Sequence, residues 1–147
     1  MSTKKPKMMK RCPECGGTIR SIAKAGRLTT YKNASALEVP ADLAIPTCVG
    51  CGSEWMDEAT AKAIDRAMEP VYLNRLREMV AHSIETLSGV VTQGELERKL
   101  GMAQGYLSKL KKGRRNPSPE IALQLAMIAR HPERRLREID EIWRHPA

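Results

Sequence analysis

Four cysteines carry the strongest chemical signal in this sequence. They lie in two copies of one motif, Cys-x-x-Cys-Gly, over residues 12–16 and 48–52, and no other cysteine is present. Each Cys-x-x-Cys turn directs two thiolates to one side, and the glycine after it allows a positive φ that turns backbone N–H groups toward sulfur. Two such turns brought together supply four ligands for one tetrahedral Zn²⁺. The expected ligands are Cys12, Cys15, Cys48 and Cys51.

Other uses of the four thiols fit the sequence less well. A thioredoxin-like redox motif needs a single pair between a strand and a helix, whereas here the pair is duplicated and β-like sequence follows Cys15. Two disulfides suit a secreted protein, but the N-terminal stretch MSTKKPKMMK lacks the apolar region of a secretory signal. An iron–sulfur cluster also accepts four cysteines and is the rarer occupant of this spacing. Because all four positions would be filled by protein, no position is left for a catalytic water, and we expect the zinc to be structural.

A second motif covers residues 92–120, TQGELERKLGMAQGYLSKLKKGRRNPSPE. Thr92 followed by Glu95 is a capping box, which predicts that a helix begins there. A turn beginning at Gly101 would end this helix and lead to a second short helix over residues 104–112. Two short helices joined by a tight glycine turn form a helix-turn-helix, and its second helix matches the major groove of DNA in width.

The predicted second helix and the basic run after it would contact DNA. Glutamine can bond adenine and lysine can reach guanine, so exposed residues of this helix would face base edges. The expected base contacts are Gln104, Gly105, Tyr106, Ser108 and Lys109. A glutamine at a helix N-terminus and clustered cations would hold phosphates. The expected phosphate contacts are Gln93, Lys111, Lys112, Arg114 and Arg115. Two alternatives stay open, because the basic run could be a solvated face and Tyr106 could serve packing alone.

The sequence between the cysteine pairs predicts strands. Residues 18–23 mix β-branched and polar side chains, residues 24–26 fit a turn, and residues 27–32 fit a returning strand. A further apolar set shares one parity, although nearby prolines limit it to edge or irregular strands: Leu37, Val39, Leu43 and Ile45. This segment is too small to fold by apolar burial alone, so metal binding must supply much of its folding free energy.

Helix formers dominate after the second cysteine pair. Asp57 is a good N-cap for a helix over residues 58–69. Pro70 is expected to end this helix and to begin another, which extends to Gly89. Apolar residues follow this second helix at helical spacing: Tyr72, Leu76, Met79, Val80, Ile84 and Leu87. Residues 118–147 predict two more helices, with Ile121, Leu125, Met127 and Ile128 in the core and a second stripe of Leu136, Ile139 and Trp143.

These elements predict two small domains. The first is a mainly-β zinc ribbon-like domain at the N-terminus, and the second is an all-α helix-turn-helix domain at the C-terminus. The expected boundaries are a basic flexible arm at 1–10, the zinc-binding domain at 11–57, a helical linker at 58–70 and a DNA-binding and dimerisation domain at 71–147. We expect a homodimer through the C-terminal domain, since such regulators read paired half-sites. The alternative is that the last stripe only completes the monomer core.

The composition favours an anionic partner. The 147 residues carry a formal net charge of +8, which fits nucleic acid. No run of about 18 apolar residues is present, so no membrane partner is expected. An enzyme is not expected, because the three histidines, His82, His131 and His145, have no apparent nucleophile to activate and the metal site would be closed.

The run TQGELERKLGMAQGYLSKLKKGRRNPS resembles the Cro/repressor-type (XRE) DNA-binding domain. The matching positions are Gln93, Leu96, Gly101, Leu107, Ser108, Gly113, Arg114 and Pro117. Three positions depart from the family pattern. Glu97 stands where a small residue is usual, Lys111 where glutamate is frequent, and Gly105 where a base-reading polar side chain is frequent.

The order of motifs along the chain is similar to that of MqsA-type (YgiT-type zinc finger) antitoxins. The similarity extends from Arg11 to about Arg137 and includes the sequence HPE at 131–133. It implies a type II antitoxin whose zinc domain binds a ribonuclease toxin and whose helix-turn-helix half represses its own operon in the bacterial cytoplasm, associated with the nucleoid. A regulator of this architecture without a toxin, and an RNA-binding protein that uses the ribbon and its basic arm, are the alternatives.

Overall fold

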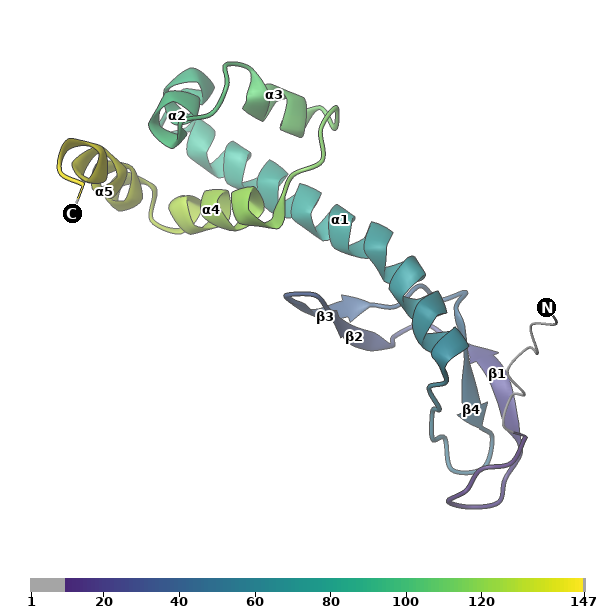
Figure 1. Ribbon diagram of the computed structural model, residues 1–147. Coiled ribbons are helices and arrows are strands. Elements are labelled where there is room, and N and C mark those ends of the chain that lie inside the picture. The colour runs from purple at the N-terminus through teal and green to yellow at the C-terminus, as the bar shows by residue number, and fades with distance from the viewer. Residues whose placement is uncertain (1–9, 147) are drawn as a thin grey trace, which may run out of the picture. The chain divides into compact units, whose positions relative to one another are not determined.

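A computed structural model describes residues 10–146, and the chain divides into two compact units between Tyr72 and Leu73 (Figure 1). The first unit is β-rich and the second is helical, as predicted. The expected basic arm lies outside the described residues except for Lys10, which is exposed. Among the described residues, no helix is both long and apolar enough to cross a membrane.

The first unit contains two antiparallel pairs of strands. Strand β1 (Ile19–Ala23) pairs with β4 (Ala44–Cys48), and β2 (Leu28–Tyr31) pairs with β3 (Ala34–Glu38). Single bridges extend the first pair on both sides, Arg11 with Thr18 and Thr47 with Glu54.

The expectation that the strand after residue 26 returns along β1 is wrong. Gly26 adopts a φ of +86°, and β2 instead turns back through Lys32 to pair with β3. Strand β1 pairs with β4, which ends at Cys48, so the two cysteine turns come to the same end of this sheet. A nearest-neighbour hairpin would have left the two pairs of thiols apart.

A buried arginine connects the two strand pairs. Arg27 is only 8% exposed, and its guanidinium donates to Glu54 Oε1 at 2.7 Å, to Thr47 Oγ1 at 3.4 Å and to the Leu43 carbonyl at 3.4 Å. The hydrogen bond from Arg27 to the Glu54 carboxylate also lowers the pKa of Glu54. A buried cation was not expected at this place.

Helix α1 (Glu58–Ser88) continues through Pro70 without a break. The prediction of two helices that meet at Pro70 is therefore wrong. A proline inside a helix removes one hydrogen bond and crowds the preceding turn, but its φ near −65° is itself helical. Met68 and Tyr72, on either side, are almost fully buried, and we attribute the continuity of the helix to this packing.

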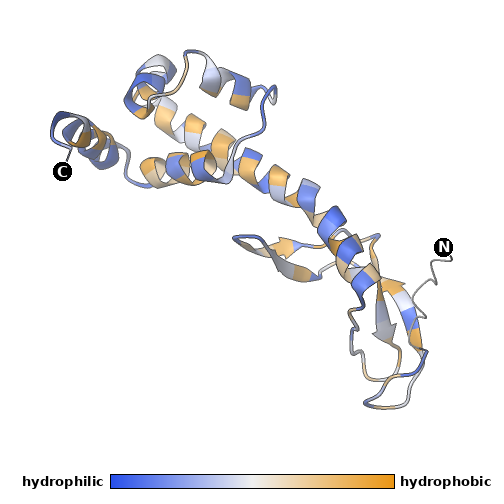
Figure 2. Cartoon of the chain, in the orientation of Figure 1, coloured by the Kyte–Doolittle hydropathy of each residue, from blue (hydrophilic) through white to orange (hydrophobic). Residues whose placement is uncertain are grey.

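The second unit consists of the rest of α1 and four shorter helices, which are α2 (Gln93–Leu100), α3 (Tyr106–Lys111), α4 (Pro119–Arg130) and α5 (Pro132–Arg144). Orange in Figure 2 marks the apolar residues of these helices, and those that are buried recur at helical spacing. The buried apolar residues of these helices are Leu76, Val80, Ile84, Leu87, Leu96, Leu107, Leu110, Ala122, Leu125, Ile128 and Leu136, and Val91 is buried just before α2. Met127, an expected core residue, is instead 50% exposed, and Trp143 of the expected second stripe is 67% exposed.

Side-chain caps begin three of the helices. In each pair the first residue accepts a hydrogen bond from the backbone N–H of the second: Asp57 and Thr60 at 2.7 Å, Thr92 and Glu95 at 3.2 Å, and Ser118 and Ile121 at 3.2 Å. The first two caps were predicted. Gly101 ends α2 with a φ of 67°, in the left-handed conformation that glycine adopts without steric cost.

Candidate metal centre and nucleic-acid interface

The four cysteines of the first unit come together in one cluster. Their sulfur atoms all lie within 4.8 Å of one another, with 3.7 Å between Cys12 and Cys51 and 3.3 Å between Cys15 and Cys48. A tetrahedral site with Zn–S bonds of about 2.3 Å separates its sulfurs by about 3.8 Å. The predicted ligand set therefore fits a structural metal site.

Two equivalent backbone turns present the thiols. Gly16 N–H bonds the Cys12 carbonyl at 2.8 Å, and Gly52 N–H bonds the Cys48 carbonyl at 3.0 Å. Both glycines have a positive φ, +73° and +76°, as the motif predicts. Two further N–H groups point at sulfur at 3.4 Å, that of Gly17, just after the first turn, at Cys15, and that of Gly50, within the second turn, at Cys48.

The space around the sulfurs depends on Gly17, which is not among the predicted residues of this site. A Cβ added at Gly17 would lie 2.9 Å from the sulfur of Cys48 and 3.2 Å from that of Cys15. A Cβ added at Gly50 would be in ordinary contact, with its nearest sulfur, that of Cys15, at 3.4 Å. The available signal in the sequence was Gly17, because the turn itself requires only one glycine after Cys15, which is Gly16.

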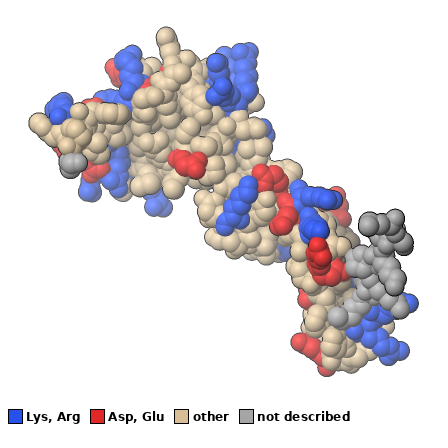
Figure 3. Space-filling model, in the orientation of Figure 1, with Lys and Arg blue, Asp and Glu red and all other residues tan. Residues whose placement is uncertain are grey.

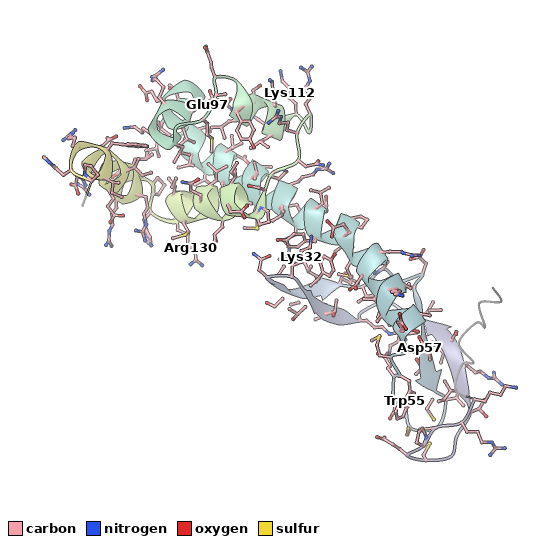
Figure 4. The ribbon with its side chains drawn as sticks, viewed as in Figure 1. Lys32, Trp55, Asp57, Glu97, Lys112 and Arg130 are labelled. Atoms are coloured by element: carbon pink, nitrogen blue, oxygen red, sulfur yellow. The ribbon has the colours of Figure 1, made fainter. Side chains whose placement is uncertain are left out.

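Polar groups beside the cluster favour the thiolate form of two ligands. The hydroxyl of Ser53 lies 3.1 Å from the sulfur of Cys51 and lowers the pKa of Cys51 to about 6. The backbone of Cys51 lowers the pKa of Cys48. Trp55 packs against the buried side of the cluster (labelled in Figure 4). Deprotonated sulfur is the form that binds a metal ion.

Apart from Gln93, the predicted DNA contacts of the second unit lie on α3, in the turn before it or in the loop after it. Gln93 is the first residue of α2 and is half-buried, as are Gly105, Tyr106 and Ser108. The remaining predicted contacts are exposed: Gln104, Lys109, Lys111, Lys112, Arg114 and Arg115. Figure 3 shows basic side chains gathered over this end of the unit, and Figure 4 labels Lys112 at the end of α3.

Helix α3 begins later than predicted. It starts at Tyr106, so Gln104 and Gly105 precede it in a turn. Gly105 is the N-cap, with a φ of +82° and no side-chain capping bond. Glutamine favours a helix, but a glycine in the left-handed conformation directly after Gln104 prevents the helix from beginning there.

The loop after α3 folds back onto this helix. The backbone N–H groups of Arg114 and Arg115 donate to the Lys109 carbonyl at 2.9 and 3.4 Å. The guanidinium of Arg115 lies 5.8 Å from the centre of the Tyr106 ring, within reach of a cation–π interaction. Base-reading and phosphate-binding candidates therefore share one surface.

Glu97 is a further residue of this site, which was not predicted as a site residue and stands out in the sequence only because the Cro/repressor-type family usually has a small residue there. It is 4% exposed, and its Oε2 accepts the backbone N–H of Leu107 at 3.0 Å. Figure 4 labels Glu97 on α2. The available signal in the sequence was a carboxylate, next to the core residue Leu96, at a position where a small residue is usual.

Comparison with models of known families matches residues 91–128 to the Helix-turn-helix family HTH_3. The match includes α2, α3 and most of α4. A search of curated proteins finds no match. The chain thus carries a helix-turn-helix domain of the kind found in DNA-binding transcriptional regulators, together with a β-rich unit that holds a four-cysteine cluster.

Proposed function

We propose that this protein is a sequence-specific regulator of transcription that reads duplex DNA with α3. The helix-turn-helix match carries the proposal, and the exposed cations around α3 support it. Gln104, Gly105, Tyr106, Ser108 and Lys109 would face base edges. Phosphates would be held by Gln93, Lys111, Lys112, Arg114 and Arg115.

Two substitutions test these roles. Lys109→Ala should cost about 1–3 kcal/mol of binding to the preferred duplex and relax specificity at one position. Arg114→Ala should weaken binding to all duplexes alike and reduce the salt slope by about one unit. Arg137→Ala, at an exposed position of α5, is the matched control. If Lys109→Ala and Arg114→Ala both bind a selected duplex as tightly as the wild-type chain, this surface does not read DNA.

We propose that the metal of the first unit is one structural Zn²⁺ held by the four cysteines. Zinc prefers four thiolates in a tetrahedral arrangement, and the sulfur separations support this choice. The residues supply a closed ligand set, so the ion would stabilise the fold. No enzymatic role is proposed for the ion or for the chain.

We further propose that the protein is the antitoxin of a type II toxin–antitoxin pair in the bacterial cytoplasm. The resemblance of its motif order to MqsA-type antitoxins supports this, and the partner of the first unit would be a ribonuclease toxin. Purification from the native host tests the proposal, because the toxin should remain bound. If the protein binds DNA but no ribonuclease copurifies with it and no ribonuclease gene lies beside its own gene, it would be a regulator without a toxin.

We propose that the active regulator is a homodimer formed through α4 and α5. An apolar groove of about 160 Å³ lies between these helices, lined mainly by Met127, Ile128, Ile139 and Ile142. Met127 and Ile142 are exposed by 50% and 62%, and a second copy is the partner that a reader of paired half-sites requires. Ile142→Asp should convert the dimer to a monomer in sedimentation velocity, whereas a wild-type chain that sediments as a monomer at micromolar concentration would contradict the proposal.

RNA binding is the second candidate function, favoured by the exposed Lys10, Arg11 and Arg20 of the first unit. Arg11 and Arg20 lie close on the ribbon, since Arg11 bridges Thr18, two residues before Arg20. A competition assay separates the candidates. Displacement of duplex DNA by single-stranded RNA at lower concentration than by unlabelled duplex would favour RNA.

A further inference from the structure

The DNA-reading helix has an unusual start. Helix α3 contains six residues, and its N-cap, Gly105, has no side chain that could accept a backbone N–H. The first N–H groups of a helix have no partner within the helix, so they require another acceptor. The N–H of Tyr106 reaches the Ala103 carbonyl at 3.1 Å. The next one, from Leu107, is buried and bonds the Glu97 carboxylate.

Glu97 spans the whole turn between α2 and α3. Its backbone carbonyl accepts the N–H of Met102 at 2.8 Å, and its Oε2 accepts that of Leu107 at 3.0 Å. One residue therefore fixes both ends of the connection. Its side chain is buried, and within the part of the chain that the structure describes no lysine or arginine forms a salt bridge with it. Among the described residues, the backbone N–H of Leu107 is the donor that the Glu97 carboxylate accepts.

We infer that Glu97 is a positioning residue for DNA recognition, which replaces the missing side-chain cap of α3. The carboxylate fixes the start of α3 at Tyr106 and keeps Gln104 and Gly105 in the preceding turn. This register determines which side chains face base edges. The inference rests on the proposed DNA-binding function, and Glu97 itself touches no base or phosphate.

A positioning role has a specific consequence for binding. Loss of the Glu97 acceptor leaves the buried Leu107 N–H without a partner, so α3 shifts or frays at its N-terminus. The cations after α3 remain in place, and non-specific binding depends on them. Specific binding should therefore fall while non-specific affinity and its salt slope stay unchanged. A merely structural role would instead lower both affinities together, because it would reduce the folded fraction.

The experiment compares four variants of the full chain. Glu97→Ala removes the acceptor, Glu97→Met removes it while filling the buried space, and Glu97→Gln keeps an acceptor oxygen. Glu95→Ala is the matched control, because it removes the same charge from an exposed position of α2. Two probes are used, a duplex selected by the wild-type chain from a random library and a duplex of scrambled sequence.

The ratio of the two affinities should fall about tenfold or more in Glu97→Ala and Glu97→Met. It should stay within about threefold of wild type in Glu97→Gln and be unchanged in Glu95→Ala. Amide hydrogen exchange of Leu107 should accelerate in the first two variants relative to that of Leu125, a core residue of α4. A wild-type ratio in both Glu97→Ala and Glu97→Met, or an equal loss in Glu97→Gln, would overturn the inference. A wild-type chain that selects no duplex would overturn the proposed function and the positioning role with it.

Discussion

Gly17→Ala should damage the metal centre without adding a new charge or polar group. The added methyl would lie 2.9 Å from the sulfur of Cys48 and 3.2 Å from that of Cys15. Ordinary nonbonded contacts between heavy atoms of this size lie at about 3.5–4.0 Å, so the overlaps are at least about 0.6 and 0.3 Å. Metal–ligand distances tolerate only about 0.2 Å. The sulfurs of Cys48 and Cys15 therefore cannot both remain at their positions as metal ligands.

The expected loss is in metal affinity. In the absence of metal the two thiols can rotate away from the methyl, so the metal-free chain should change little. A disturbance of this kind typically costs about 10–100-fold in affinity, or about 1.4–2.7 kcal/mol. Competition with a chromophoric chelator measures the affinity for Zn²⁺. The absorption spectrum of the Co²⁺-substituted protein reports whether four thiolates still surround the ion.

Gly16→Ala is the control for this experiment. Its Cβ would meet no atom within 4 Å, but its φ is +73°, so the substitution adds backbone strain of about 1–2 kcal/mol. It should lower the apparent affinity, because metal binding and folding are coupled, and yet leave the four-thiolate Co²⁺ spectrum intact. The reasoning is refuted if Gly17→Ala binds Zn²⁺ as wild type does and gives an unaltered Co²⁺ spectrum.

Two further predictions concern stability and ionisation. Thr92→Ala removes the side-chain cap of α2 and should cost about 1 kcal/mol of the free energy of unfolding, measured by urea denaturation with Thr92→Ser as the conservative control. The hydrogen bond between Tyr31 and Glu69 raises the pKa of Tyr31 to about 12. The contribution of this hydrogen bond to the free energy of unfolding should therefore be complete below pH 10, the usual pKa of tyrosine. It should be lost as the pH rises through about 12. NMR of the Tyr31 ring carbon should show Glu69→Gln returning this pKa toward 10, and an unchanged value would contradict the assignment.

Local chemistry could be predicted from the sequence and non-local pairing could not. The two Cys-x-x-Cys-Gly turns follow from spacing alone, because each is closed by a hydrogen bond within five residues, such as that from Gly16 to Cys12. The partner of β1 is different. A turn signal near Gly26 favours pairing of β1 with the next strand along the chain. The actual partner of β1 is β4, and we attribute this pairing to the closure of the cysteine cluster, which a local sequence pattern does not indicate.

The two errors on the helices have a common physical origin. Pro70 was weighed by its local cost, and the burial of Met68 and Tyr72 around it depends on tertiary packing. The helix propensity of Gln104 predicts that α3 starts there, whereas the left-handed Gly105 moves the start to Tyr106. Glu97, on another helix, then accepts the buried N–H of Leu107. In both cases the propensity of a single residue did not decide the structure, because tertiary packing or a neighbouring glycine opposed it.

Each unit of this chain carries its own fluorophore. The sequence has two tryptophans. Trp55 packs against Cys12, Ile19 and Cys48 at the metal centre, whereas Trp143 is 67% exposed and donates its Nε1–H to the Lys99 carbonyl at 2.7 Å. Because indole emission depends on the polarity around the ring, a Trp143→Phe chain would report metal binding alone. A Trp55→Phe chain would report the docking of α5 on α2, so the two halves can be followed spectroscopically without any attached label.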